Sequence, residues 1–283
     1  MQELIEKAAR DLIDAQHVIA LTGAGISTES GIPDYRGPSG IWTKNPEAEQ
    51  KAYQSYPKFL KNPVEYWEER LGSASPWGDL SKIDPNAGHF ALAELETLGI
   101  IKWVITQNVD NLHQRAGSRN VIDYHGNAFK LRCIDCNSRF KCEEYDLKAL
   151  QEQGKLPPRC KKCGGRVKSD VVHFGEPIPN DSAHQSLEES LKSDVILICG
   201  TSAVVFPFAE LPRIARQRST DRADQTHRGL HALGRIPAVT IIEVNAAWTP
   251  LTEDRISDYL IQGRTGEILR KIVSEIKRLN KLN

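Results

Sequence analysis

The sequence predicts an α/β fold in which a doubly wound parallel sheet carries two smaller parts. Short apolar runs alternate with amphipathic segments along the 283 residues, as strands and helices do in a parallel sheet. Two Cys-x-x-Cys pairs, separated by 23 residues, predict a small zinc-binding ribbon. A stretch with four prolines and many aromatic residues predicts a third part, a loop with short helices.

The positions of these patterns set the expected elements and boundaries. Amphipathic helices are expected over Gln2–Ala15, Asn86–Leu98 and Thr265–Leu279, where apolar side chains recur every three or four residues. Buried strands are expected at 18–21, 101–106, 121–124, 194–199, 238–244 and 259–261. The sheet domain then covers 1–41, 79–127 and 170–283, the loop with its short helices covers 42–78, and the zinc domain covers 128–169.

The first strand leads into a turn rich in glycine. Gly23-Ala24-Gly25 follows the apolar run 18–21, and glycine there lets backbone N–H groups approach a pyrophosphate. The hydroxyls of Ser27, Thr28 and Ser30 can cap the helix that follows, whose N-terminus favours an anion. A dehydrogenase fingerprint needs glycine at position 28 and an acidic residue at a strand end about 20 residues later. Because both are absent, we expect a dinucleotide to be held in another way.

Polar side chains follow five of the expected strands at the point where each strand ends. Ligands of doubly wound sheets bind beyond the carboxyl ends of the strands, so these side chains should converge on one crevice. Any one of them taken alone could be an ordinary loop residue. They are found in Thr22 to Gly25, in Thr106-Gln107-Asn108-Val109-Asp110, in His125-Gly126, in Gly200-Thr201-Ser202 and at Asn245.

His125 is the only histidine at the end of an expected strand. Imidazole titrates near neutral pH, so His125 is a candidate general base, with a capping or buried structural histidine as the alternative. The other seven histidines are expected to be ordinary residues. Among them, His89 and His113 lie in helices, and the role of His173, beside Phe174, is left open.

Four cysteines supply thiolates at the spacing of two zinc knuckles. Four thiolates complete a tetrahedral site with no open position, which makes the zinc structural and not catalytic. A pair of redox-active motifs is the alternative. Cys142 and Cys199 are out of register and should fill space as small apolar side chains. The expected ligands are Cys133, Cys136, Cys160 and Cys163.

The overall composition limits the partners and compartments. The 37 basic and 37 acidic residues give a net charge of zero, which argues against non-specific nucleic-acid binding. The sequence shows neither a basic-plus-apolar leader nor a long apolar segment, so we expect neither secretion nor membrane insertion. Thiols that bind metal suit a reducing compartment. We therefore expect a cytoplasmic protein, and we expect it to be a monomer.

In their order along the chain, the motifs resemble those of the sirtuins, the NAD-dependent protein lysine deacylases. The resemblance spans residues 18–245, and the whole series is specific although each motif alone is ambiguous. It implies a Rossmann-like NAD-binding sheet. Besides the four cysteines and His125-Gly126, the matching motifs are Gly23-Ala24-Gly25-Ile26-Ser27, Gly31-Ile32-Pro33-Asp34-Tyr35-Arg36, Thr106-Gln107-Asn108-Val109-Asp110, Val172-His173-Phe174-Gly175-Glu176, Gly200-Thr201-Ser202 and Val244-Asn245.

The resemblance implies that NAD is consumed and not reduced, which agrees with the missing dehydrogenase fingerprint. In such enzymes the acyl-lysine oxygen attacks the nicotinamide ribose and nicotinamide leaves. His125 would then act as general base on a ribose hydroxyl, and the acyl group would be transferred to give 2′-O-acyl-ADP-ribose and free lysine. The resemblance makes Asn108 a second catalytic residue.

The resemblance also implies which residues bind the two substrates. Gln107 and Asn108 would position the ribose, Asp110 with Ile32 the carboxamide, and Arg36 the phosphates. The strand that pairs with an extended peptide would be Val172, His173, Phe174, Gly175 and Glu176. The other implied NAD contacts are Gly23, Ala24, Gly25, Ser27, Asp34 and Tyr35, with Gly200, Thr201, Ser202 and Asn245 on the adenosine half.

Three departures from the family pattern bear on turnover and specificity. Tyr35 stands where the family usually has a phenylalanine that shields the reaction centre. Tyr66 is followed at the third position by Glu69 and then by Arg70, not by the Tyr-x-x-Arg pair of the succinyl-selective members, which favours an acetyl or other uncharged acyl group. Residues Ser219–Arg235 resemble an insertion and are expected to form a solvated mobile loop.

Two other functions are alternatives to deacylation. One is a mono-ADP-ribosyltransferase or NAD hydrolase on the same scaffold, which would share the release of nicotinamide but not acyl removal. The other is a non-catalytic NAD-binding zinc module, against which the presence of His125 and Asn108 argues. The sequence thus predicts a deacylase and leaves its target proteins open.

Overall fold

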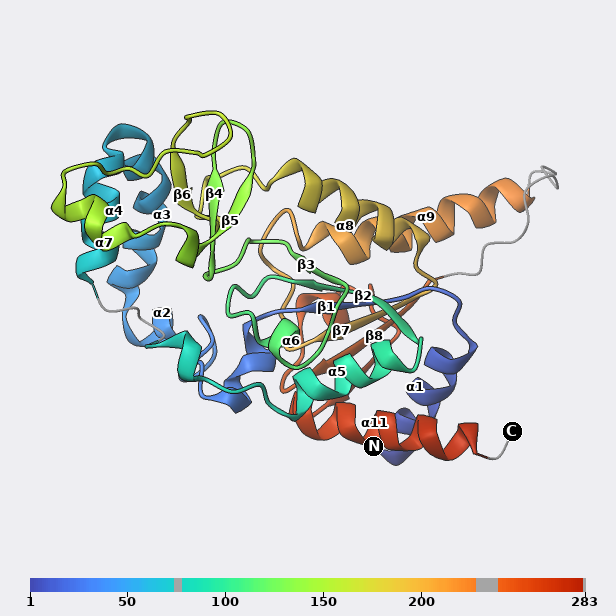
Figure 1. Cartoon of the computed structure of the whole chain (residues 1–283). Helices are drawn as coiled ribbons and strands as arrows, with labels where there is room; N and C mark the ends of the chain where they lie inside the picture. Colours follow the sequence, from blue (N-terminus) through green and yellow to red (C-terminus); the bar gives the residue numbers. More distant parts are fainter. Residues whose placement is uncertain (74–77, 228–238, 282–283) are drawn as a thin grey trace.

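The computed structural model describes residues 1–73, 78–227 and 239–281 and contains the predicted parallel sheet (Figure 1). All neighbouring strands in this sheet run parallel, in the order β3-β2-β1-β7-β8-β9. The six predicted strands are therefore confirmed, with ends that shift by one or two residues. They are β1 Val18–Thr22, β2 Ile101–Thr106, β3 Val121–Asp123, β7 Val195–Cys199, β8 Thr240–Asn245 and β9 Tyr259–Gln262.

The strand order places a switch point between β1 and β7. From β1 the chain adds β2 and β3 on one side, and from β7 it adds β8 and β9 on the other. Loops that leave the two central strands therefore diverge, and a crevice opens between them at the carboxyl ends.

Helices cover both faces of the sheet (Figure 1). The strands alternate their side chains between the two faces. On one face lie α1 Gln2–Asp14, α5 Ala87–Thr97 and α11 Thr265–Asn280, packed on side chains such as Ala20 and Leu197. On the other face, α8 Asn180–Lys192 and α9 Glu210–His227 lie across the sheet. β1 and β7 are buried along their whole length, as their apolar runs predict.

A second, antiparallel sheet forms the zinc ribbon. Its strands are β4 Lys130–Cys133, β5 Arg139–Lys141 and β6 Val167–Ser169, in the order β5-β4-β6. The turn η3 Cys142–Glu144 and the helix α7 Leu147–Glu152 lie between β5 and β6 along the chain.

The stretch expected as a loop with short helices is mostly helical, so that expectation is wrong in part. α2 Ile41–Lys44 is short, but α3 Pro46–Lys61 has 16 residues and α4 Pro63–Gly72 has 10. Two of the prolines that suggested a loop, Pro46 and Pro63, are the first residues of helices, a position where proline is favoured. The side chains of Asn45 and Asn62 cap the N-termini of these helices.

The helices α3 and α4 share one apolar cluster with the zinc ribbon, which the sequence did not predict. Phe59 and Trp67 of the helices pack with Leu131 and Val167 of the ribbon strands. The indole N–H of Trp67 donates to the Val167 carbonyl at 3.0 Å. The ribbon therefore takes part of its apolar core from another segment of the chain.

The insertion expected as a loop begins as helix. Residues 219–227 continue α9, so the loop prediction is wrong for them, and the rest of the insertion, with Arg228, His231 and Arg235, lies outside the described residues. Short elements elsewhere are η1 Ala24–Ser30, η2 Leu80–Lys82, α6 Leu112–Arg115 and α10 Pro250–Glu253. Within the described ranges, no helix combines the length and apolar character that crossing a bilayer requires.

Candidate active site

A cleft of about 630 Å³ opens at the carboxyl ends of the central strands, where the predicted polar residues converge. Its lining includes every predicted catalytic, NAD-binding and substrate residue except Gly23. Those residues are Ala24, Gly25, Ser27, Ile32, Asp34, Tyr35, Arg36, Gln107, Asn108, Asp110, His125, Val172, His173, Phe174, Gly175, Glu176, Gly200, Thr201, Ser202 and Asn245.

The two glycines after β1 are needed for a reason that the sequence did not reveal. A Cβ on Gly23 would lie 2.6 Å from the Thr201 side chain, and a Cβ on Gly25 would lie 2.7 Å from the Gly200 carbonyl. The Gly25 N–H donates to that same carbonyl at 2.8 Å. The glycines therefore let the loops after β1 and β7 touch each other.

Ser27 sits inside the 3₁₀ helix and not at its start, so the predicted cap is wrong. Helix η1 begins at Ala24, and the Ser27 hydroxyl donates instead to Asp110 at 2.7 Å. The Thr28 hydroxyl donates back to the Gly25 carbonyl at 2.8 Å. The hydroxyl of Ser27 thus joins the loops after β1 and β2.

Asn108 is fixed by the same loops. Its amide nitrogen donates to the Gly23 carbonyl at 3.1 Å and to the Ser27 hydroxyl at 3.0 Å. Both amide hydrogens are then used, so the side-chain oxygen is the atom left to accept from a ligand. Asn108 therefore presents an oriented, uncharged acceptor at the cleft.

His125 follows β3 and lies in the cleft as a neutral imidazole. Burial lowers its pKa to about 4, and a hydrogen bond to the backbone of Gln107 opposes that shift in part. Its ring packs edge-on against Tyr124 at a centroid distance of 5.3 Å. Because it is unprotonated at neutral pH, it can accept a proton from a bound hydroxyl group.

Three strand ends are tied together beside His125. The Gln107 amide donates to the Thr201 hydroxyl at 2.8 Å, and the Asn245 amide donates to the Thr201 carbonyl at 3.1 Å. These bonds join the loops after β2, β7 and β8 around the cleft.

An aromatic wall closes one side of the cleft. Trp42 packs on Tyr35 at 4.7 Å and on Phe174 at 5.5 Å between ring centroids, and Tyr53 packs on Phe174 at 4.4 Å. Burial, with the nearby charge of Asp110, raises the pKa of Tyr35 to about 12, so its phenol stays neutral. Trp42 and Tyr53 were not predicted as cleft residues, because they lie in a stretch that was expected to be a loop with short helices.

Arg36 lines the cleft but its charge is engaged. The guanidinium lies 3.2 Å from a Glu49 oxygen and 4.5 Å above the Trp42 ring. A phosphate that binds Arg36 must therefore compete with the Glu49 carboxylate.

Two histidines that were expected to be ordinary helix residues lie buried under the cleft. The imidazole of His89 lies 3.4 Å from the Ser27 hydroxyl, and its ring contacts the ring of His113 at 4.9 Å. His113 in turn contacts the Thr22 hydroxyl at 2.9 Å. Burial lowers the pKa of both, to about 4 for His89. The sequence carries no signal for this packing beyond the helical positions.

The segment expected to be a substrate-pairing strand contains a turn in this structure, and its pairing with a peptide stays a prediction. The N–H of Glu176 donates to the His173 carbonyl at 3.0 Å, and Gly175 has a φ of 77°. His173, whose role was open, contacts the Tyr66 hydroxyl at 3.0 Å. The turn nevertheless borders the cleft along its length.

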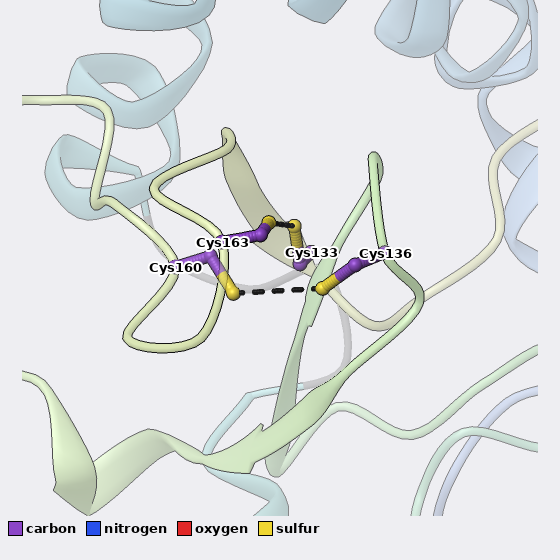
Figure 2. Close-up of side chains that lie close together, drawn as sticks. All are labelled: Cys133, Cys136, Cys160 and Cys163. Carbon is purple, nitrogen blue, oxygen red and sulfur yellow. Dashed lines mark hydrogen bonds between the residues drawn. The ribbon is translucent and has the colours of Figure 1, made fainter.

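The four predicted cysteines meet in one cluster (Figure 2). All four sulfurs lie within 4.8 Å of one another, with Cys133–Cys163 at 3.5 Å and Cys136–Cys160 at 3.7 Å. Zn–S bonds of about 2.3 Å in a tetrahedron place sulfurs about 3.8 Å apart, so the cluster fits a structural zinc. Cys142 is not in the cluster, and Cys199 is buried in the sheet core, as expected.

Comparison with known proteins agrees with this geometry. A sequence model described as the Sir2 family matches residues 23–207. The NAD-dependent protein deacylase 2 of Archaeoglobus fulgidus is 42% identical over 283 residues, covering 99% of this chain and 98% of the relative.

Solved structures agree as well. A Sir2 homologue in complex with NAD has a TM-score of 0.70 and 36% identity, over 99% of this chain and 94% of that one. A Sir2 protein with a deacetylated p53 peptide and 3′-O-acetyl-ADP-ribose has a TM-score of 0.71 and 32% identity, over 96% and 98%.

The fold and the site together define an NAD-consuming enzyme with a structural zinc ribbon. With a family match over more than half its length and a relative 42% identical along nearly all of it, the chain belongs to the Sir2 family. Its activity is NAD-dependent protein deacylation.

Proposed function

We propose that this enzyme removes uncharged acyl groups, acetyl foremost, from lysine side chains of proteins, with His125 as general base. The observation that carries the proposal is the neutral imidazole of His125 in the same cleft as the oriented amide of Asn108. The products are nicotinamide, free lysine and 2′-O-acyl-ADP-ribose.

In this proposal the loops after the strands hold NAD. Gln107 and Asn108 position the nicotinamide ribose, and Asp110 with Ile32 binds the carboxamide. Arg36 binds the phosphates and gives up its ion pair with Glu49 to do so. The loop at 200–202 and Asn245 hold the adenosine. Fixed amides suit an electron-poor ribose carbon, because they orient the reacting atoms without a charge that would attract water.

The protein substrate lies along the turn at 172–176 in this proposal. The N–H groups of Val172 and His173 are already engaged by the His125 carbonyl and the Glu176 carboxylate. Phe174 and Gly175 are then the backbone positions that an extended peptide would pair with, as in β-augmentation.

The preference for an uncharged acyl group is supported by the cleft lining more than by Glu69. Glu69 forms an ion pair with Lys58 at the surface, and neither Glu69 nor Arg70 lines the cleft. The repulsion first expected from Glu69 therefore carries little weight. The side chains of Tyr35, Trp42 and Phe174 carry no charge, and the Arg36 guanidinium beside Trp42 is engaged by Glu49. A succinyl carboxylate would therefore be costly to bury there unpaired.

Matched peptides carrying acetyl, butyryl and succinyl lysine test the proposal. We expect kcat/KM to be at least about tenfold lower for the succinyl peptide, since one unpaired buried charge costs more than about 1.4 kcal/mol. Mass spectrometry should find one 2′-O-acyl-ADP-ribose for each lysine freed. ADP-ribose released without acyl removal, or ADP-ribosylated protein, would favour the NAD hydrolase or the ADP-ribosyltransferase instead.

We further propose the domain limits 1–41, 79–127 and 170–283 for the sheet domain, 42–78 for the helices at its edge, and 128–169 for the zinc ribbon. A monomer in a reducing, cytoplasmic compartment is proposed as well, since zinc-binding thiols must stay reduced. Light scattering tests whether the protein is a monomer, and the zinc content of freshly purified protein tests whether its thiols are reduced and bind metal.

A further inference from the structure

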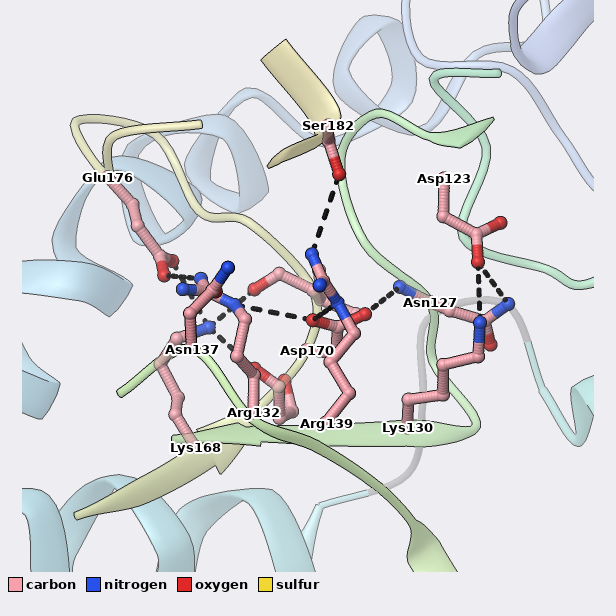
Figure 3. Close-up of polar contacts among 12 residues, drawn as sticks. Asp123, Asn127, Lys130, Arg132, Asn137, Arg139, Lys168, Asp170, Glu176 and Ser182 are labelled. Carbon is pink, nitrogen blue, oxygen red and sulfur yellow. Dashed lines mark hydrogen bonds and ion pairs between the residues drawn. The ribbon is translucent and has the colours of Figure 1, made fainter. Parts of the chain in front are cut away.

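The turn that borders the cleft is attached to the zinc ribbon by a buried group of charges, which we call the ribbon cluster: Arg132, Lys168, Asp170 and Glu176 (Figure 3). Arg132 of β4 and Lys168 of β6 are directly opposed in the register of the two strands. Two cations in that position repel each other, and burial without anions would be very costly. The two carboxylates of the cluster supply that compensation.

Glu176 joins both cations to the turn. One of its oxygens accepts from Arg132, and the other lies 3.1 Å from the Lys168 ammonium. The second oxygen also accepts the backbone N–H of His173 at 3.0 Å, while the N–H of Glu176 donates to the His173 carbonyl. A single carboxylate therefore closes the turn and fastens it to the ribbon.

Lys168 adds a second attachment to the same segment. Its ammonium donates to the carbonyls of Ser169 and Val171, in addition to its ion pair with Glu176. An ammonium has three N–H donors, so all three are directed at residues 169–176. The side chain is fully buried, which leaves water no place to substitute for these partners.

Asp170 and the backbone link the other end of the segment to the catalytic residue. Asp170 lies 3.3 Å from Arg132 and accepts the N–H of Asn127 at 3.1 Å. The N–H of Val172 donates to the His125 carbonyl at 2.8 Å. The segment 170–176 is thus held between His125 and the ribbon.

We propose that Glu176 is a positioning residue for substrate binding, which the cations of the ribbon hold in place and which in turn holds the backbone of Phe174 and Gly175 ready for the peptide. Its carboxylate points into the ribbon cluster, so it acts through the turn and does not contact the substrate (Figure 3). The inference rests on the proposed function, because it takes the acyl peptide to lie along this turn. The zinc ribbon then contributes to substrate affinity as well as to folding.

The variant Glu176→Gln tests this role, because it keeps the shape of the side chain and removes its charge. A hydrogen bond to a charged group contributes more than a neutral one, so we expect the KM for the acyl peptide to rise about tenfold. If the turn binds the peptide equally well in the ground state and in the transition state, weakening the turn raises only the KM for the peptide. We therefore expect kcat and the KM for NAD to stay within about twofold. Glu152→Gln, on the exposed end of α7 in the same ribbon, is the matched control and should leave all three constants unchanged.

A second variant covers the case in which the single change prevents folding. Lys168→Met with Glu176→Gln removes a cation and an anion together, which buried ion pairs tolerate better than the loss of one partner. The double variant should keep its zinc and its affinity for NAD, which metal analysis and calorimetry measure. It should still show the raised KM for the peptide. An unchanged peptide KM in either zinc-loaded variant, or a fall in kcat alone, overturns the proposal. Wild-type protein that binds NAD but deacylates no peptide would instead refute the proposed function.

Discussion

The parallel sheet and the zinc ribbon are stabilised in different ways. The central strands β1 and β7 bury apolar side chains on both faces, between two layers of helices. The ribbon has three strands of three or four residues, and it buries Arg132, Lys168 and the thiols of Cys133 and Cys160. The strands β1 and β7 bury mostly valine, isoleucine and leucine.

The difference follows from size. A segment as short as the ribbon cannot enclose enough apolar surface to fold by itself, and small modules use metal ions or neighbours instead. This ribbon has a cysteine cluster that can hold a metal ion. It also packs against neighbouring helices, since Phe59 of α3 and Trp67 of α4 complete its apolar cluster. The large sheet should therefore be insensitive to metal, while the ribbon depends on it.

Loss of zinc should have the largest effect, because it should unfold the ribbon and leave the large sheet folded. Cys160→Ser is expected to purify without zinc and to lose the ordered ribbon, because structural zinc supplies on the order of 10 kcal/mol of folding free energy. Hydrogen exchange should then be fast over 128–169 and still slow in β1 and β7. Cys142→Ser, which alters a thiol outside the cluster, is the control, and loss of zinc from it would contradict the ligand assignment.

The second largest effect is expected in the sheet domain, where chemistry and stability are separate. His125→Ala should lower kcat by about 10²–10⁴, the usual contribution of a general base, while NAD affinity and melting temperature change little. Steady-state kinetics measures kcat, and calorimetry measures the NAD affinity and the melting temperature. His184→Ala, on an exposed face of α8, should have no effect, and near wild-type turnover by His125→Ala would refute the role.

A smaller effect should appear in the pH dependence of stability. His89 has a folded pKa of about 4 and an unfolded pKa of about 6.5, so between these values the unfolded state binds more protons. The free energy of unfolding should therefore rise with pH through this window and level off above it. Fully buried His89 alone would contribute about 3 kcal/mol.

Denaturant titrations at pH 5.0 to 7.5 measure that slope. In His89→Gln, which keeps a polar side chain, the slope should fall by about one proton, and in His184→Gln it should not change. Taking the difference between variants cancels the protonation of the zinc thiolates, which also lowers stability in acid. An identical slope in wild type and His89→Gln would show that His89 is not buried as a neutral group.

The smallest effect concerns the hydroxyl of Tyr35 in the aromatic wall. Its phenol stays neutral, so Tyr35→Phe removes only neutral hydrogen bonding, worth about 1 kcal/mol for each bond. We expect kcat to change by less than about tenfold, and the ratio of NAD hydrolysed to lysine deacylated to fall, because a phenyl ring excludes water better. A rise in that ratio would mean that the hydroxyl helps to keep water out.

The sheet was predictable because its signal is local. Runs such as Val18–Thr22 are apolar and short, and a polar residue marks where each one ends. The four cysteines were predictable for the same reason, since their spacing is a property of two short segments.

Features that depend on contacts between distant segments were not predictable. The burial of His89 against His113 is created by packing of α5 on α6, and the sequence shows only two polar residues in helices. Glu176 was placed among the substrate contacts because it lies in a motif, while its partners Arg132 and Lys168 come from the strands of the zinc ribbon. The length of α3 was missed because proline at a helix start looks like proline in a loop.

The bonds from Gln107 and Asn245 to Thr201 have a thermodynamic consequence. They connect three strand ends far apart in the sequence through direct contacts within the protein, so the surface proposed to bind the adenosine half is formed by folding itself. NAD then has little ordering entropy to overcome there, and it has no comparable surface to bind on the unfolded chain. By mass action, NAD at 100 times its dissociation constant should add about 2.7 kcal/mol to the free energy of unfolding. The coenzyme thus acts as a stabiliser of the sheet domain before any acyl group is transferred.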